Sequence, residues 1–165
     1  MFQKASQLGI LRTVVILSVA TFAFTQWGYI WYATVFDDVW QSLIGRTEQD
    51  LVALAVSRGP IQSFFTYFIS FVQAVGLFVL INIARAKTFW DYQFIAAVVA
   101  LMIAVPVLGN AVLFAGTSIA LWGLDIAHFI LGYAGIALVF FIGRYTGLHE
   151  AAPRRGVVTE GHHEI

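Results

Sequence analysis

Three long stretches of the chain contain no charged residue, and they constrain its fold more than any other feature. They cover residues 13–36, 59–84 and 92–124. A membrane-spanning helix needs about 20 mostly apolar residues, so each of the first two stretches predicts one crossing. The third is too long for one crossing, and its small and polar residues at 114–118 are typical of a turn. We therefore predict four spans, at about 13–36, 60–84, 92–113 and 119–143.

The composition supports a membrane location. Hydrophobic residues make up 60% of the 165 residues and charged residues 11%, whereas soluble proteins contain about 25% charged residues. A soluble domain of this size has too much surface to hide so many apolar side chains. We expect an all-α integral membrane four-helix bundle, formed by residues 1–150 as a single transmembrane domain in contact with membrane lipid. The net charge of zero argues against a nucleic-acid partner, and the absence of cysteine excludes disulfides and thiolate chemistry.

The basic residues predict the orientation, because lysine and arginine are enriched in cytoplasmic segments. If both termini are cytoplasmic, only Arg46 and Arg58 lie outside. The basic residues then inside are Lys4, Arg12, Arg85, Lys87, Arg144, Arg154 and Arg155. The first apolar stretch is too long for a signal peptide, and no small-x-small cleavage site ends it. We expect a multi-pass protein of a bacterial-type inner membrane.

The segment between the first two spans, residues 37–58, has the pattern of short amphipathic helices. Its apolar residues Val39, Trp40, Leu43 and Ile44 recur at helical spacing. Thr47, with Asp50 three residues later, resembles a capping box that opens a second helix. We expect both pieces to lie flat in the membrane interface. The polar tail, residues 151–165, is predicted to be a disordered cytoplasmic segment.

Two ionisable residues, Asp125 and His128, fall inside the fourth predicted span. A charge at mid-membrane costs about 2.5–3.5 kcal/mol on insertion scales, and residues three apart on a helix share a face. We predict that they pair and form a polar cluster, opened to one side by a bend at Pro106. The predicted cluster comprises Asp125, His128, Asn110, Tyr29, Tyr32, Gln26, Thr66 and Ser70.

Two interpretations of this cluster remain open. In one, Asp125 is a hydrogen-bonding centre that holds the helices in register, with His128 as its partner. In the other, the pair binds a proton, a cation or a polar head group, since ionisable groups inside membranes often mark functional pathways.

The sequence lacks the residue patterns of several enzyme and cofactor classes. A haem bound by two histidines needs a second membrane histidine, and His128 is the only histidine in a predicted span. An H-E-x-x-H zinc motif and a G-x-S-x-G elbow are both missing. We therefore expect no catalytic, cofactor-binding or metal site.

Several short motifs resemble those of domain of unknown function 1761, a family of small four-span membrane proteins found mostly in bacteria. The motifs are Gly28-Tyr29-Ile30-Trp31-Tyr32 with Phe36 and Trp40, then Gly45-Arg46-Thr47-Glu48-Gln49-Asp50-Leu51, then Pro106, Gly109-Asn110, Leu113 and Phe114, and finally Asp125-Ile126-Ala127-His128. The resemblance implies the four-span architecture and brings no established activity.

Two functions fit these features. The first is a non-enzymatic accessory or interaction subunit, or a homo-oligomer, because nearly the whole chain is membrane helix. The alternative is a carrier or binder of a small molecule, lipid or proton that uses Asp125 and His128.

Overall fold

The computed structural model describes residues 2–148, and the side chains of residues 9–144. This part of the chain is helical, with no strand. Its elements are α1 (Phe2–Ile30), the π-helical segment η1 (Trp31–Val35), α2 (Asp37–Ile44), α3 (Glu48–Arg58), α4 (Pro60–Ile83), α5 (Phe89–Ala115) and α6 (Ile119–Leu148). The predicted all-α class is confirmed. The predicted tail, residues 151–165, lies outside the described residues.

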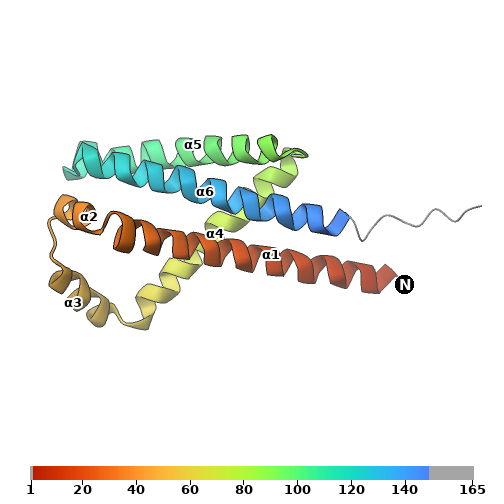
Figure 1. Cartoon of the computed structure of the whole chain (residues 1–165), viewed down its shortest axis with the longest axis horizontal. Helices are drawn as coiled ribbons and strands as arrows, with labels where there is room; N and C mark the ends of the chain where they lie inside the picture. Colours follow the sequence, from red (N-terminus) through yellow and green to blue (C-terminus); the bar gives the residue numbers. More distant parts are fainter. Residues whose placement is uncertain (1, 149–165) are drawn as a thin grey trace, which may run out of the picture.

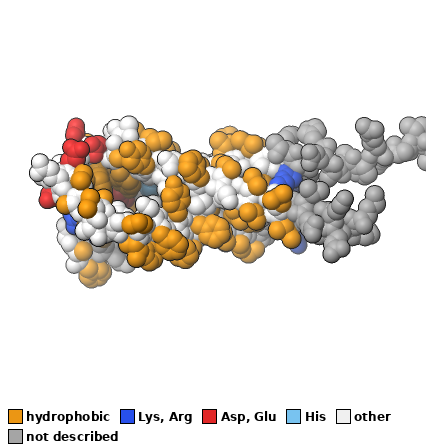
Figure 2. Space-filling model, turned by 90° about the horizontal axis from the view of Figure 1, so that it is seen from below, with side chains coloured by type: hydrophobic (Ala, Val, Ile, Leu, Met, Phe, Trp, Pro, Cys, Tyr) orange, Lys and Arg blue, Asp and Glu red, His pale blue; other side chains and the backbone are white. Residues whose placement is uncertain are grey.

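Four of these helices are long and apolar enough to cross a membrane. The candidate spans are Gly9–Val35, Pro60–Ile83, Phe89–Ala115 and Ile119–Arg144. At 1.5 Å per residue, even the shortest exceeds the roughly 30 Å of a hydrocarbon core. Hydrophobic side chains cover much of the surface, and acidic ones gather at one end (Figure 2). The chain is therefore a multi-pass membrane protein.

The spans are arranged around α6, which packs against both α5 and α1, while α1 also packs against α4 (Figure 1). Helix α1 begins and α6 ends at the same end of the assembly (Figure 1). We call this the loop end, because the α4–α5 loop, residues 84–88, lies there too. The other end carries α2 and α3 and is called the α3 end.

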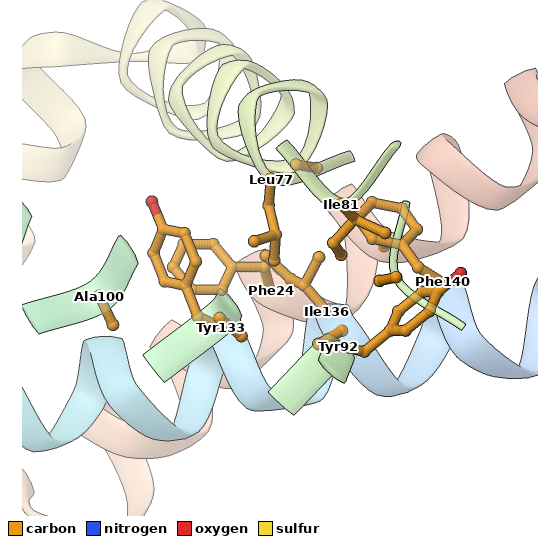
Figure 3. Packing of buried hydrophobic residues seen from close by; sticks show 13 residues of the cluster. Phe24, Leu77, Ile81, Tyr92, Ala100, Tyr133, Ile136 and Phe140 are labelled. Atoms are coloured by element: carbon orange, nitrogen blue, oxygen red, sulfur yellow. The ribbon is translucent and has the colours of Figure 1, made fainter. Parts of the chain in front are cut away.

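The side chains of the core come from all four long helices (Figure 3). Leu77, Tyr133 and Ile136 are its largest fully buried residues. Glycine lets α1 and α6 approach closely, since a Cβ on Gly132 would lie 2.4 Å from the Phe24 ring. Small residues at such contacts are what membrane helices use to pack, because lipid supplies little hydrophobic drive between them.

The helix α4 belongs to this core along only part of its length. Its buried residues are Ser70, Ala74, Leu77 and Ile81, and every residue from 61 to 69 is exposed. Figure 1 shows α4 inclined to α1, so that the two helices diverge toward α3. The first half of α4 therefore stands away from the rest of the assembly.

Capping boxes fix where two helices start. Thr47 caps α3 and Asp50 accepts from the Thr47 backbone N–H, at 2.9 Å, which confirms the predicted box. Thr88 and Asp91 form a second box at the start of α5, three residues before the predicted start of that span. The box satisfies backbone donors that would otherwise lack partners.

Two arginines join helices at the loop end. The guanidinium of Arg12 on α1 donates to the backbone carbonyls of Gly143 and Arg144 on α6. The guanidinium of Arg144 donates to the Ala86 carbonyl and, at 3.2 Å, to the Tyr92 hydroxyl. These bonds tie α1, α6 and the α4–α5 loop together.

Candidate functional site: a groove between α1 and α4

The buried imidazole of His128 is the least expected feature of the interior. The residue lies on α6 and is 7% exposed. Within the described part of the chain, neither Nδ1 nor Nε2 has a hydrogen-bond partner. A buried polar group without a partner typically costs about 1–3 kcal/mol. Such a group requires an explanation in structure or function.

Aromatic rings surround His128 on the side of α1. The Tyr32 ring lies closest, with a centroid separation of 4.9 Å, and Phe24 and Trp31 follow at 5.7 and 6.2 Å. The ring of Trp27 is nearly parallel to the imidazole, and its Nε1 donates to the His128 carbonyl at 3.1 Å. These contacts position the imidazole by packing alone.

The backbone of Gly28 lies directly beside the imidazole. A Cβ built on Gly28 would be 3.5 Å from His128 Nε2, with no other atom nearer than 4 Å. A methyl group would fit there in ordinary contact, yet it would cover the nitrogen. Nε2 is itself buried, so the missing side chain leaves space beside this nitrogen but no open route to it.

The carboxyl group of Asp125 has a different partner from the predicted one. Its Oδ1 accepts a hydrogen bond from the Tyr32 hydroxyl at 2.7 Å, and His128 does not bond to it. The cause is η1, in which the Phe36 N–H bonds the Trp31 carbonyl five residues back. This wider turn carries Tyr32 to α6. The predicted Asp125–His128 pair is therefore wrong.

A groove of about 690 Å³ separates α1 from the first half of α4, with α3 at one end and His128 and Phe129 of α6 in its wall. We call it the α1–α4 groove. Polar side chains line it, including Thr25, Gln26, Gln62, Ser63, Thr66 and Gln73. Where the helices converge, Thr25 Oγ1 donates to Ser70 Oγ at 2.9 Å. Binding pockets for small molecules have volumes of roughly 300–1,000 Å³, so the groove has a suitable size.

A second recess adjoins this groove at the α3 end. It is lined by α2, α3 and residues 115–118, and its volume is about 1080 Å³. We call it the vestibule, and Tyr29, Ala55 and Gln62 line both spaces. Charged residues lie in the vestibule, among them Arg46 and Arg58. None of the described residues in the wall of the α1–α4 groove is Asp, Glu, Lys or Arg.

Most of the predicted cluster lies around this groove. The predicted residues in its wall are Gln26, Tyr29, Tyr32, Thr66, Ser70 and His128. Asp125 is outside the wall and reaches it through Tyr32. Asn110 is exposed on α5 and does not line the groove. The groove opens between α1 and α4 rather than at Pro106, which lies within the continuous helix α5.

Several groove residues were not in the predicted cluster. Gln62, Gln73 and Ser63 extend the polar face that Thr66 and Ser70 begin on α4. These residues recur at steps of three or four along α4, and this helical spacing predicts that they share one face of the helix. Gln73 Oε1, like His128, is buried without a hydrogen-bond partner among the described residues. No three His, Asp or Glu side chains gather into a metal site between residues 9 and 144.

The family comparison covers both the groove and the four spans. A family model described as "Protein of unknown function (DUF1761)" matches residues 14–141, which is more than half of the chain. The chain belongs to the DUF1761 family. The match includes the α1, η1, α4 and α6 residues that line the groove. Neither a curated protein nor a solved structure matches this DUF1761 chain.

Proposed function

We propose that this DUF1761 protein is a non-enzymatic binder or carrier of a small molecule dissolved in the membrane, which it holds in the α1–α4 groove. The observation that carries the proposal is His128, a buried imidazole that borders the groove and has no hydrogen-bond partner for either nitrogen among the described residues. A ligand that bonds this ring would recover a hydrogen bond that the protein alone does not make.

The shape of α4 supports the same function. Residues 61–69 are exposed although they include Gln62, Ser63 and Thr66. Polar groups inside a membrane are usually buried against protein or face a water-filled cavity. A bound molecule in the groove would give the Gln62 and Ser63 side chains partners, whereas the Thr66 hydroxyl already donates to the Gln62 carbonyl at 2.9 Å.

Filling the groove is the direct test. Thr66→Trp places a large ring in the groove on an exposed part of α4, and Val72→Trp adds the same ring at an exposed position outside it. Lipid extracts of the purified variants, analysed by mass spectrometry, should show a co-purifying molecule with wild type and Val72→Trp and lose it with Thr66→Trp. Equal recovery from all three proteins would contradict the proposal.

The orientation is part of the proposal. We infer that the loop end faces the cytoplasm of a bacterial-type inner membrane, because Arg12, Arg85, Lys87 and Arg144 lie toward that end and Arg46 and Arg58 toward the other. The sequence contains no cysteine, so a single introduced cysteine is the only residue of the protein that a maleimide labels through a thiol. Ser57→Cys should react with an impermeant maleimide on intact spheroplasts, and Lys87→Cys only after lysis. The reverse pattern would invert the orientation.

The exposed first half of α4 also favours a second candidate function, in which a helix of another membrane protein or of a second copy occupies the groove. Such an accessory or homo-oligomeric protein would purify with the occupant in a fixed ratio. Native mass spectrometry distinguishes the candidates, since a monomer with a bound small molecule supports the first and a stable dimer or heteromer supports the second.

A further inference from the structure

The wall of the α1–α4 groove restricts the charge of what it holds. Among the described residues, its wall contains amide and hydroxyl groups and the imidazole of His128, and no Asp, Glu, Lys or Arg. A charged head group buried there would have no permanently charged side chain in the wall as its counter-charge, and an unpaired buried charge is strongly unfavourable. The arginines Arg46 and Arg58 lie in the neighbouring vestibule instead. The wall therefore favours an uncharged head group.

The same wall restricts the shape of the head group. The rings of Phe24, Tyr29, Tyr32, Tyr67 and Phe129 line the groove. Aromatic rings pack well against another flat ring, in stacked or edge-to-face contacts. Apart from His128, the other polar side chains of the wall are hydroxyls and amides, which donate hydrogen bonds to carbonyl oxygens. A flat ring with carbonyl oxygens matches both parts of the wall.

The route into the groove favours a molecule with an apolar chain. The exposed stretch 61–69 of α4 leaves the space between α1 and α4 open along the side of the assembly. An apolar chain attached to the ring would leave through this opening into lipid. A water-soluble ligand would not need an opening toward lipid.

Resting on the function proposed above, we propose that the ligand belongs to the quinone class: an uncharged ring with carbonyl oxygens and an apolar tail, its ring in the α1–α4 groove and one carbonyl oxygen bonded to His128. An imidazole ring carries a donor N–H on at least one nitrogen. Because both nitrogens are buried, the imidazole turns toward the groove beside Gly28 when the ligand binds.

Decylubiquinone is the test probe, with the protein in phosphatidylcholine nanodiscs. Trp27 and Trp31 lie against His128, so a quinone in the groove should quench their fluorescence and raise the unfolding temperature, with saturation at one per protein. His128→Leu and Gly28→Ala should each weaken this binding by about tenfold, the equivalent of one lost hydrogen bond. Gly76→Ala is the matched control, because a Cβ there meets no atom within 4 Å.

Oleate, lysophosphatidate and decanol, titrated in the same way, separate the ligand class from the proposed function. If one of them saturates with the same dependence on Gly28→Ala while decylubiquinone does not, the quinone class is wrong and the binding function stands. If none of the four probes gives saturable binding that Gly28→Ala weakens, both proposals are overturned. Gly28→Ala keeps the test decisive even where His128→Leu fails to fold.

Discussion

The Tyr32 hydroxyl donates a 2.7 Å hydrogen bond to Asp125, and this bond joins the π-helical end of α1 to the start of α6. It gives the carboxyl group a partner within the membrane, whereas His128, one turn further along α6, has none in the part of the chain that the structure describes. The two ionisable residues of the fourth span therefore differ in role. Asp125 connects two helices, whereas His128 borders the groove.

Removing the hydroxyl should destabilise the protein. Tyr32→Phe leaves the half-buried Asp125 carboxyl without its donor, and we expect a loss of about 1–3 kcal/mol in the free energy of unfolding. Asp125→Asn keeps an acceptor oxygen for Tyr32 and should stay near wild type. Unfolding in detergent, followed by circular dichroism, measures both.

Tyr29→Phe is the control for this change, because Tyr29 is 66% exposed. If Tyr32→Phe unfolds at the same point as Tyr29→Phe, the hydrogen bond does not stabilise the protein. If Asp125→Asn leaves stability intact but abolishes ligand co-purification, Asp125 has a binding role beyond this bond.

A second prediction concerns the close contact between α1 and α6. Gly132→Ala would put a Cβ 2.4 Å from the Phe24 ring and 3.0 Å from Trp27, in a buried site where overpacking typically costs about 1–3 kcal/mol. Gly135→Ala, on an exposed face of the same helix with no atom within 4 Å, should be neutral or stabilising by up to about 1 kcal/mol. Chemical denaturation should rank the two variants in this order, and equal midpoints would refute the close packing.

The sequence was sufficient to predict the four spans because their apolar lengths leave lipid as the only suitable solvent. The ends of the helices were harder to predict than their presence. Helix α5 begins at Phe89 rather than 92 because Thr88 and Asp91 cap it, and this T-x-x-D pattern before an apolar run was a readable signal. The capping box of Thr47 and Asp50 was read from the same kind of pattern and is present.

The cluster was harder to predict than the spans because it depends on helix rotation. A regular α-helix would not bring Tyr32 to Asp125 in the same way as η1, and nothing in residues 31–35 marks a π-helical turn. Asn110 has the polarity of a groove residue, but its position on α5 turns it outward. The closeness of Gly28 to His128 Nε2 depends on how the helices pack, so it could be seen only in the structure.

Arg144 should hold the loop end together. Its guanidinium donates to the Ala86 carbonyl and the Tyr92 hydroxyl, so Arg144→Met removes both bonds and leaves the buried Tyr92 hydroxyl without this donor. We expect faster amide exchange in the α4–α5 loop and a loss of about 1–3 kcal/mol. Arg58→Met, an exposed residue at the α3 end, is the control, and equal protection of the loop in both variants would contradict the prediction.

The stability of the first turn of α3 should depend on pH. The Thr47 side chain and backbone bond the Asp50 carboxylate and lower the pKa of Asp50 below its usual value. Because the pKa is lower in the folded state, the ionised carboxylate stabilises α3 above the unfolded pKa of about 3.9, and this stabilisation is lost as pH falls through the lower folded value. Amide exchange at residues 48–52, corrected for the intrinsic rate, should therefore accelerate between about pH 5 and pH 2. Thr47→Ala removes the side-chain bonds of the cap and keeps the backbone N–H that donates to Asp50. Its α3 should therefore exchange faster at pH 5 and change less on acidification. An equal pH response in the variant and wild type would show that Asp50 does not act through the cap.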